Sequence, residues 1–324
     1  MGRNNPGCNI LDPGLLENAV VNLSAVNEQA TKLVNSRCLK NEFEAAWLLK
    51  AITCIDLTTL AGDDTSSNVT RLCRKAARPL PEDLLNYLGF EYDADCPIRT
   101  AAVCVYPSKV EAAVATLHML GLSDKINVAS VATGFPCGQT PLFTRLEEIK
   151  WAVKQGAKEI DIVIDRSLVL TGQWERLYNE IKEMRDACGD AHMKAILAAG
   201  ELTNLSNVYK ASTIAMMAGA DFIKTSTGKE SINATIPIGI VMCRAIADYY
   251  KKTNFKVGLK PAGGIKTSND AINWLVMIKE ILGDAWLTPE LFRIGASGLL
   301  SDLEHRLYQI VTEKIGEPYE FSMG

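Results

Sequence analysis

Histidine is scarce in this chain, and its cysteines are not arranged for a metal or for disulfide bonds. The 324 residues include three histidines (His118, His192 and His305) and nine cysteines, with no Cys-x-x-Cys pair. A zinc site needs Cys and His clustered at ligand spacing, and a disulfide framework favours an even number of cysteines in a short secreted chain. We therefore expect no metal site, and reduced thiols in the core of a cytoplasmic protein.

The chain also lacks a surplus of basic residues and a long apolar run. A net charge of -4 and a pI of about 5.6 argue against nucleic acid as the main partner, because binding a phosphate backbone needs a basic surface. No apolar run reaches the ~18 residues of a membrane span, and the start MGRNNPGCNILDPG has no apolar core of a signal peptide. We expect a soluble protein without a nucleic-acid or membrane partner. These features leave a homo-oligomer open.

What the chain does have is a regular alternation of short apolar runs and longer amphipathic stretches. Eight runs rich in Val, Ile and Ala predict strands at 51–57, 100–106, 127–133, 159–164, 193–199, 222–228, 256–262 and 291–296. Short buried runs one strand–helix unit apart suit parallel strands covered on both faces. We predict a (β/α)8 TIM barrel. The alternative, an open doubly wound sheet, usually has fewer strands and a Gly-x-Gly-x-x-Gly turn, which this chain lacks after its first strand.

Several residues indicate where helices begin and end. Ser108, Thr144 and Thr267 each precede an acidic residue by three positions, which is the pattern of an N-cap. Gly156 and Gly219 stand where a helix should stop before the next strand. Between the first two strands, the segments TSSN and PEDLLNYLGF predict two further helices.

The first part of the chain lies outside this alternation. An apolar stripe from Leu15 to Val26 predicts a helix packed on the outside or base of the barrel. We therefore divide the chain into an N-terminal helical extension (1–45), the barrel (46–315) and a C-terminal tail (316–324).

The charged residues that we single out within the apolar runs are Asp56 in the first, Asp161 in the fourth, Lys224 in the sixth and Lys260 in the seventh. An unpaired buried charge is strongly unfavourable, so such residues are usually paired, neutralised or functional. We expect all four near the carboxyl ends of their strands, where barrel enzymes place their chemistry. The alternative is a set of ion pairs that only holds the barrel together.

Two of these charges are related by a short internal repeat. In GAKEID and GADFIK, the charge follows the helix-ending Gly by five positions. Asp161 and Lys224 should therefore lie at similar heights on even-numbered strands, and alternate strands supply one layer of a barrel interior. We predict that the two side chains face each other and that Lys260 reaches the same point.

Loops rich in Gly and Lys follow the last three predicted strands. They carry Gly228, Lys229, Gly263, Gly264, Lys266, Gly295 and Ser297. Barrels often bind phosphate with the loops after strands 7 and 8 beside a helix N-terminus, where free backbone N–H groups point at the anion. We predict a phosphate site there, although any one glycine pair is also compatible with an ordinary turn.

Six segments together resemble the deoxyribose-phosphate aldolase family: IDLTTL, AAVCVYP, EIDIV, FIKTSTGK, KPAGGIK and FRIGAS. The likeness covers roughly residues 45–300, and the N-terminal part is similar to the longer animal-type members. The resemblance implies that Lys224 forms a Schiff base, that Lys260 and Asp161 tune it and relay protons, and that Asp56 and Thr58 help to bind substrate. The implied phosphate ligands are Gly228, Lys229, Gly263, Gly264, Lys266, Gly295 and Ser297.

The same resemblance implies reversible cleavage of the phosphosugar 2-deoxy-D-ribose 5-phosphate to acetaldehyde and D-glyceraldehyde 3-phosphate, with no metal or organic cofactor. The attacking amine must be neutral, yet a free lysine with a pKa of ~10.4 is almost wholly protonated at neutral pH. Two ammonium groups about 4 Å apart repel by about 4 kcal/mol at an effective dielectric of about 20, so Lys260 beside Lys224 would lower the pKa of Lys224. A Schiff-base aldolase or transaldolase acting on another phosphosugar, and a binding barrel without catalysis, stay open.

The C-terminal tail EPYEFSMG carries one aromatic hydroxyl, on Tyr319. Termini of this kind are usually disordered. The alternative is that the tail folds over the barrel mouth and brings Tyr319 near Asp161, where it would assist proton transfer.

Overall fold

Eight short strands form the centre of the fold. The computed structural model describes residues 5–8, 10–16, 19–35, 41–91, 96–316 and 321. The strands are β1 (Ile55–Thr58), β2 (Ala102–Val105), β3 (Asn127–Ala132), β4 (Glu159–Val163), β5 (His192–Ile196), β6 (Phe222–Lys224), β7 (Gly258–Lys260) and β8 (Ile294–Ala296). Each lies within or overlaps one of the eight predicted runs.

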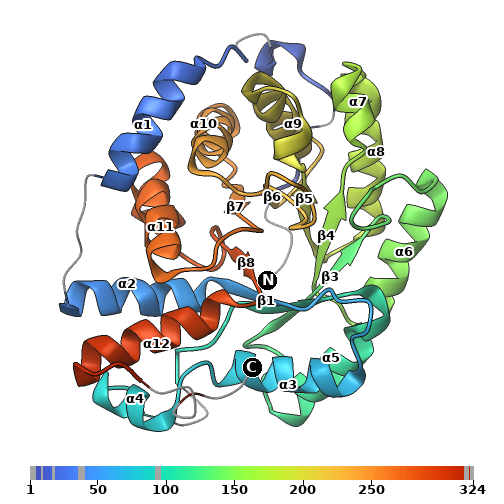
Figure 1. Ribbon diagram of the computed structural model, residues 1–324. Coiled ribbons are helices and arrows are strands. Elements are labelled where there is room, and N and C mark those ends of the chain that lie inside the picture. Colours follow the sequence, from blue (N-terminus) through green and yellow to red (C-terminus); the bar gives the residue numbers. More distant parts are fainter. Residues whose placement is uncertain are drawn as a thin grey trace.

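The strands are all parallel and close into a barrel (Figure 1). Their order is β7-β6-β5-β4-β3-β2-β1-β8, and parallel bridges between Leu259 and Phe292 and between Ala262 and Gly295 join the two edge strands. The predicted (β/α)8 barrel is confirmed. Because every strand points the same way, the loops that follow the strands meet at one mouth.

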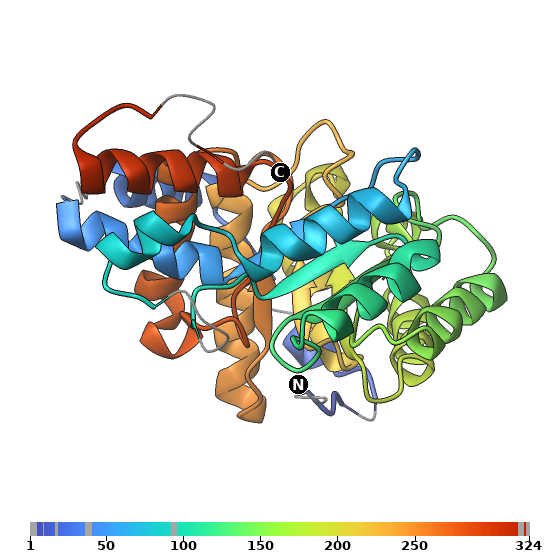
Figure 2. The same cartoon turned by 90° about the horizontal axis from the view of Figure 1, so that it is seen from below.

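Helices surround the strands in Figures 1 and 2. The barrel helices are α3 (Ser66–Ala77), α5 (Val110–Met119), α6 (Leu142–Lys154), α8 (Trp174–Ala187), α9 (Leu205–Met217), α10 (Ile236–Thr253), α11 (Ser268–Leu282) and α12 (Leu299–Thr312). The additional elements are η1 (Pro13–Leu15), α1 (Leu23–Asn35), α2 (Asn41–Thr53), α4 (Glu82–Tyr87), η2 (Pro107–Lys109), α7 (Arg166–Leu170), η3 (Ala199–Glu201) and η4 (Asp284–Trp286). No helix in the described parts is long and apolar enough to cross a membrane.

Some of the predicted helix ends are confirmed and others are wrong. Thr267 forms a capping box with Asp270 at the start of α11, and Gly156 and Gly219 have φ values of 101° and 98° after α6 and α9. Thr144 lies inside α6, which begins after Pro141. The N-cap predicted at Ser108 is also wrong, because a 3-10 turn that starts with proline precedes α5. In both places the fixed φ of proline sets the start of the helix.

The N-terminal part is helical but differs in detail from the expectation. The stripe from 15 to 26 is not one helix, because η1 ends at Leu15 and α1 begins only at Leu23. Helix α1 packs against α10 and α11, and α2 packs against α11 and α12. Helix α2 crosses the boundary proposed at residue 45 and takes up the first three residues of the first predicted strand run. The two helices predicted after the first strand are present as α3, capped by Thr65, and α4.

The first described residues seal the end of the barrel that lies away from the mouth. The Asn5 side chain is fully buried and donates to the backbone oxygens of Met216 and Ala220, just before β6. Its backbone N–H donates to Asp221, which also pairs with the buried Arg185. These contacts pair polar groups that burial would otherwise leave without partners, so they stabilise this end of the barrel.

Candidate active site

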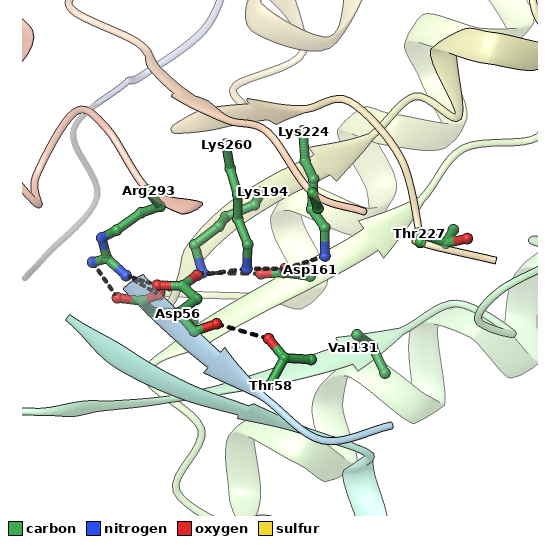
Figure 3. Close-up of polar contacts among 12 residues, drawn as sticks. Asp56, Thr58, Val131, Asp161, Lys194, Lys224, Thr227, Lys260 and Arg293 are labelled. Carbon is green, nitrogen blue, oxygen red and sulfur yellow. Dashed lines mark hydrogen bonds and ion pairs between the residues drawn. The ribbon is translucent and has the colours of Figure 1, made fainter. Parts of the chain in front are cut away.

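Seven charged side chains meet inside the barrel, and each of the seven residues is at most 3% exposed. They are Asp56, Glu159, Asp161, Lys194, Lys224, Lys260 and Arg293. We call them the charge cluster. Figure 3 shows the lysine side chains converging on Asp161. A set of buried charges is tolerated only when the charges satisfy one another, so these contacts fix the positions of the side chains.

Asp161 is the centre of the charge cluster. Its Oδ1 accepts a hydrogen bond from Lys194 Nζ at 2.9 Å. Its Oδ2 accepts one from Lys224 Nζ at 2.8 Å and one from Lys260 Nζ at 2.7 Å. The predicted meeting of Asp161, Lys224 and Lys260 is confirmed. Because two lysines share one carboxylate oxygen, their nitrogens lie close enough to repel each other strongly when both are protonated.

The remaining contacts run from Lys260 to Arg293. Lys260 Nζ lies 2.5 Å from Asp56 Oδ2, and Arg293 contacts Asp56 Oδ1 at 2.5 Å and Glu159 Oε1 at 2.9 Å. Glu159 also pairs with Lys194. Glu159, Lys194 and Arg293 were not predicted as site residues, although all three stand in predicted strand runs. The signal was the same one, a charge in an apolar run.

All four charged residues were expected near the carboxyl ends of their strands, and this is right for the two lysines but not for the two aspartates. Lys224 and Lys260 are the last residues of β6 and β7, but Asp56 is second in β1 and Asp161 is third in β4. The two carboxylates therefore lie deeper in the barrel than the backbone of the lysines. Contact is still made because the flexible four-carbon stem of lysine reaches down to the carboxylates.

The electrostatics distinguish Lys224 from the other lysines. Burial lowers its pKa, and the ammonium of Lys260 lowers it further against the opposing effect of Asp161. Burial would also lower the pKa values of Lys194 and Lys260, but their carboxylate partners outweigh it and raise both. The cluster has four basic groups and three carboxylates. A neutral Lys224 leaves three cations against three anions.

Asp161 remains ionised in this surrounding. Burial would raise its pKa, but the ammonium groups of Lys194, Lys224 and Lys260 outweigh burial and hold the pKa well below its usual range. A carboxylate of such low basicity is a weak base by itself. It is well suited to orient an amine or a water molecule and to balance positive charge.

Lys224 is the member of the charge cluster that opens on a cavity of about 620 Å³ at the barrel mouth. The predicted substrate residues that line this cavity are Thr58, Gly228, Lys229, Gly263, Gly264, Lys266, Gly295 and Ser297. Asp56 is different, because it lies fully buried among the ion pairs and does not line the cavity. The structure therefore places Asp56 where it supports Lys260, away from the space that a substrate would fill.

The loops after β7 and β8 offer backbone donors to this cavity. Among the described residues, the N–H groups of Gly263, Gly264, Ser297 and Gly298 donate to no protein acceptor. Gly263 and Gly264 have φ values of 78° and 83°, which favour glycine. Gly298 precedes the 14-residue helix α12, which has no side-chain cap. Free amides at a helix N-terminus suit an anion such as phosphate.

Gly295 has a different role in the geometry. A Cβ atom at this position would lie 2.9 Å from Ala262 Cβ and 3.2 Å from Lys260 Cε. The absence of a side chain therefore leaves room for the stem of Lys260 to reach Asp161. This packing accounts for a glycine at position 295 without the predicted phosphate contact.

Two other expectations concern residues away from this cluster. Within the described parts of the chain, no group of three or more His, Cys, Asp or Glu side chains is placed to hold a metal ion. Tyr319 lies outside the described residues, so its approach to Asp161 stays a prediction. Phe321, which is described, packs its ring against His305 and Tyr308 of α12.

Replacing Lys260 with methionine should lower activity at neutral pH by about a hundredfold. Without the neighbouring ammonium, the pKa of Lys224 should rise, because a repulsion of about 3 kcal/mol at about 5 Å and a dielectric of about 20 is lost. A smaller fraction of the amine is then neutral. The pH–activity profile of the variant should therefore have its rising limb at higher pH, with part of the activity recovered there. A uniform loss at every pH would show that Lys260 acts in another way.

Comparisons with known proteins agree with this geometry. A family model described as DeoC/LacD family aldolase matches residues 50–301. Over 314 residues, 97% of both chains, the protein is 59% identical to the human deoxyribose-phosphate aldolase and 58% identical to the mouse one. A solved deoxyribose phosphate aldolase from Aeropyrum pernix, 24% identical, has the same fold with a TM-score of 0.56, covering 81% of this chain and 96% of its own.

The chain is a parallel barrel with a buried lysine pair, and an aldolase family model matches most of its length. These two findings define its class as a lyase of the aldolase type. Identity to the mammalian proteins extends over nearly the whole chain, including the N-terminal part. The chain belongs to the deoxyribose-phosphate aldolases of the DeoC/LacD family.

Proposed function

We propose that this protein is a Schiff-base aldolase that reversibly cleaves 2-deoxy-D-ribose 5-phosphate to acetaldehyde and D-glyceraldehyde 3-phosphate. The observation that carries the proposal is Lys224, a buried lysine with a lowered pKa, whose amine opens on a cavity lined by the loops predicted to bind phosphate. The names of the mammalian relatives support the choice of substrate.

In the proposed reaction, the neutral amine of Lys224 attacks the C1 aldehyde of the open-chain sugar. Loss of water gives a protonated imine, which accepts the electron pair of the C2–C3 bond when that bond breaks. The C3 hydroxyl loses its proton and becomes the aldehyde of glyceraldehyde 3-phosphate. The remaining enamine takes a proton at C2, and hydrolysis of the imine releases acetaldehyde.

We assign the proton transfers to water held by Asp161, beside the ammonium group of Lys260. Asp161 lies 2.8 Å from Lys224 Nζ and 2.7 Å from Lys260 Nζ, so it can orient a water molecule between the imine and the second lysine. Thr58, which lines the cavity, is the proposed contact for a hydroxyl of the sugar. The proposal needs no metal or organic cofactor.

The phosphate is proposed to bind the loops after β6, β7 and β8. Replacing Lys266, an exposed residue of the cavity wall, with alanine should raise KM for the phosphorylated sugar by about tenfold, since an ion pair to a phosphate is lost. Unphosphorylated deoxyribose should be cleaved with unchanged kinetics. Steady-state assays with both sugars check this, and equal losses on both would mean that Lys266 does not meet the phosphate.

A direct comparison of substrates tests the proposed function. Purified protein should cleave 2-deoxyribose 5-phosphate, with acetaldehyde formation followed by an alcohol dehydrogenase. Ribose 5-phosphate and ketose phosphates should react far more slowly. Preference for another phosphosugar would support the alternative of a different Schiff-base aldolase or a transaldolase, and no turnover of any sugar would support a binding barrel.

We also propose a reducing compartment, the cytoplasm, for this protein. The cysteines of the described residues are all free, and most are buried, as expected for reduced core thiols. A homo-oligomer is part of the same proposal. The Aeropyrum pernix protein is described as a tetramer, and measuring the mass in solution would test this chain.

A further inference from the structure

A buried carboxylate stands beside the predicted phosphate loop, where an anion would be unfavourable for the substrate. Glu230 directly follows Gly228 and Lys229, and its side chain is 2% exposed. It is not part of the charge cluster, and it does not line the cavity. A negative charge in this place repels a bound phosphate, so other contacts must stabilise the Glu230 carboxylate there.

The contacts of Glu230 are mainly with the backbone of its own loop. Its two carboxylate oxygens each accept the N–H of Thr227 at 3.0 Å, and Oε2 also accepts the N–H of Gly228 at 3.1 Å. The next amide, of Lys229, donates to the hydroxyl of Thr227 at 3.1 Å. Hydrogen bonds from amides to a carboxylate are among the stronger ones, so this loop is held in one shape.

These contacts determine what the loop can offer to a ligand. The N–H groups of Thr227 and Gly228 are engaged by Glu230, in contrast to the free amides of the loops after β7 and β8. The backbone contact predicted for Gly228 is therefore not available in this conformation. Lys229, whose exposed side chain stands on the cavity wall, is the group of this loop that is left to meet a phosphate.

The same residue connects the loop to its neighbours. The backbone oxygen of Glu230 accepts a hydrogen bond from the Asn233 amide at 2.8 Å. The Asn233 side chain lies directly against Gly263, since a Cβ there would be 2.7 Å from Asn233 Cγ. On the other side, the Arg166 guanidinium lies 4.0 Å from Glu230 and 2.6 Å from Glu201. Glu230 thus stands between the loops after β4, β6 and β7.

We infer that Glu230 is a positioning residue for recognition of the phosphate, an inference that rests on the proposed function. It never touches the substrate. By holding the amides of Thr227 and Gly228, it fixes the loop that presents Lys229 to the phosphate group. Preference for phosphorylated over unphosphorylated sugar therefore depends on Glu230, despite the negative charge that it brings close to the site.

The experiment compares Glu230→Met, which removes every acceptor at similar length, with Glu230→Gln, whose one oxygen can still accept both amides. KM and kcat are measured for 2-deoxyribose 5-phosphate and for 2-deoxyribose. For the methionine variant, we expect KM for the phosphorylated sugar to rise about tenfold with kcat nearly unchanged, and no change for deoxyribose. The glutamine variant should show a rise of about threefold. Glu201→Gln is the matched control, because Glu201 pairs with the same Arg166 but accepts no amide of this loop; it should behave as the wild type.

A double-mutant cycle with Lys229→Ala tests whether Glu230 acts through Lys229. If it does, combining Lys229→Ala with Glu230→Met should cost no more than the larger single effect. Independent, multiplying effects would overturn the inference, and so would equal losses on both sugars or a lower KM for the phosphorylated sugar. If Glu230→Met does not fold, the glutamine variant decides, since an unchanged or lower KM there contradicts the role. Failure of the wild type to cleave the phosphorylated sugar would instead overturn the proposed function.

Discussion

Replacing Lys224 with methionine should abolish cleavage, with a loss of kcat of about 10⁵-fold or more. The covalent route disappears with the amine, and binding alone supplies little of the acceleration. The variant should nevertheless fold well. Methionine resembles the stem of a neutral lysine, and the remaining cluster has three cations against three carboxylates. Assays of kcat and a melting curve check the two halves of this prediction.

Trapping identifies the reactive lysine independently. Treating the wild type with substrate and borohydride should attach a fragment to Lys224, which a peptide digest and mass spectrometry would locate. Lys224→Arg is the matched control for charge, because it keeps a cation but cannot form an imine; it should be inactive and less stable than the methionine variant. A fragment on Lys260 or Lys194, or activity retained without Lys224, would contradict the assignment.

The fold could be predicted from the sequence because each strand–helix unit repeats the same local pattern. The predictions of helix and strand ends that were wrong concern segments whose structure depends on tertiary packing or on a proline. Residues 51–53 look like the start of a strand, yet they continue helix α2, since a short apolar run fits a buried helix as well as a strand. Pro141 and the turn starting at Pro107 displaced two expected N-caps. The N-cap pattern of a Ser or Thr followed three positions later by an acidic residue does not reveal either effect.

The site was predictable where equal offsets related two strands. Asp161 and Lys224 followed from such offsets, and the contact at 2.8 Å agrees. The buried ion pairs behind Lys224 were not predictable in this way. Lys194 on β5 pairs with Glu159 on β4, and the register between these strands is a property of the whole barrel. The position of Asp56 below the cavity depends on Arg293, a residue 237 positions later. Local patterns contain no information about such a contact.

Replacing Asp161 with asparagine should lower kcat by about 10²–10⁴-fold, the range for losing a group that manages proton transfer. Asparagine keeps the shape but removes the negative charge on which the amines of Lys194, Lys224 and Lys260 converge. Breaking a buried ion pair usually costs about 3–5 kcal/mol of stability, so the melting temperature should fall as well. A decrease in kcat of less than tenfold in a folded variant would show that proton transfer does not depend on Asp161.

The loss of stability and the loss of catalysis can be separated with a second substitution. Asp161→Asn leaves two carboxylates, Asp56 and Glu159, against Lys194, Lys260 and Arg293 when Lys224 is neutral. Adding Lys194→Met restores two cations against two anions, so the double variant should melt at a higher temperature than Asp161→Asn alone. Its kcat should stay low, because Lys224 and Lys260 still lack the negatively charged carboxylate that they share. Recovery of activity together with stability would mean that Asp161 serves only to balance the buried charges.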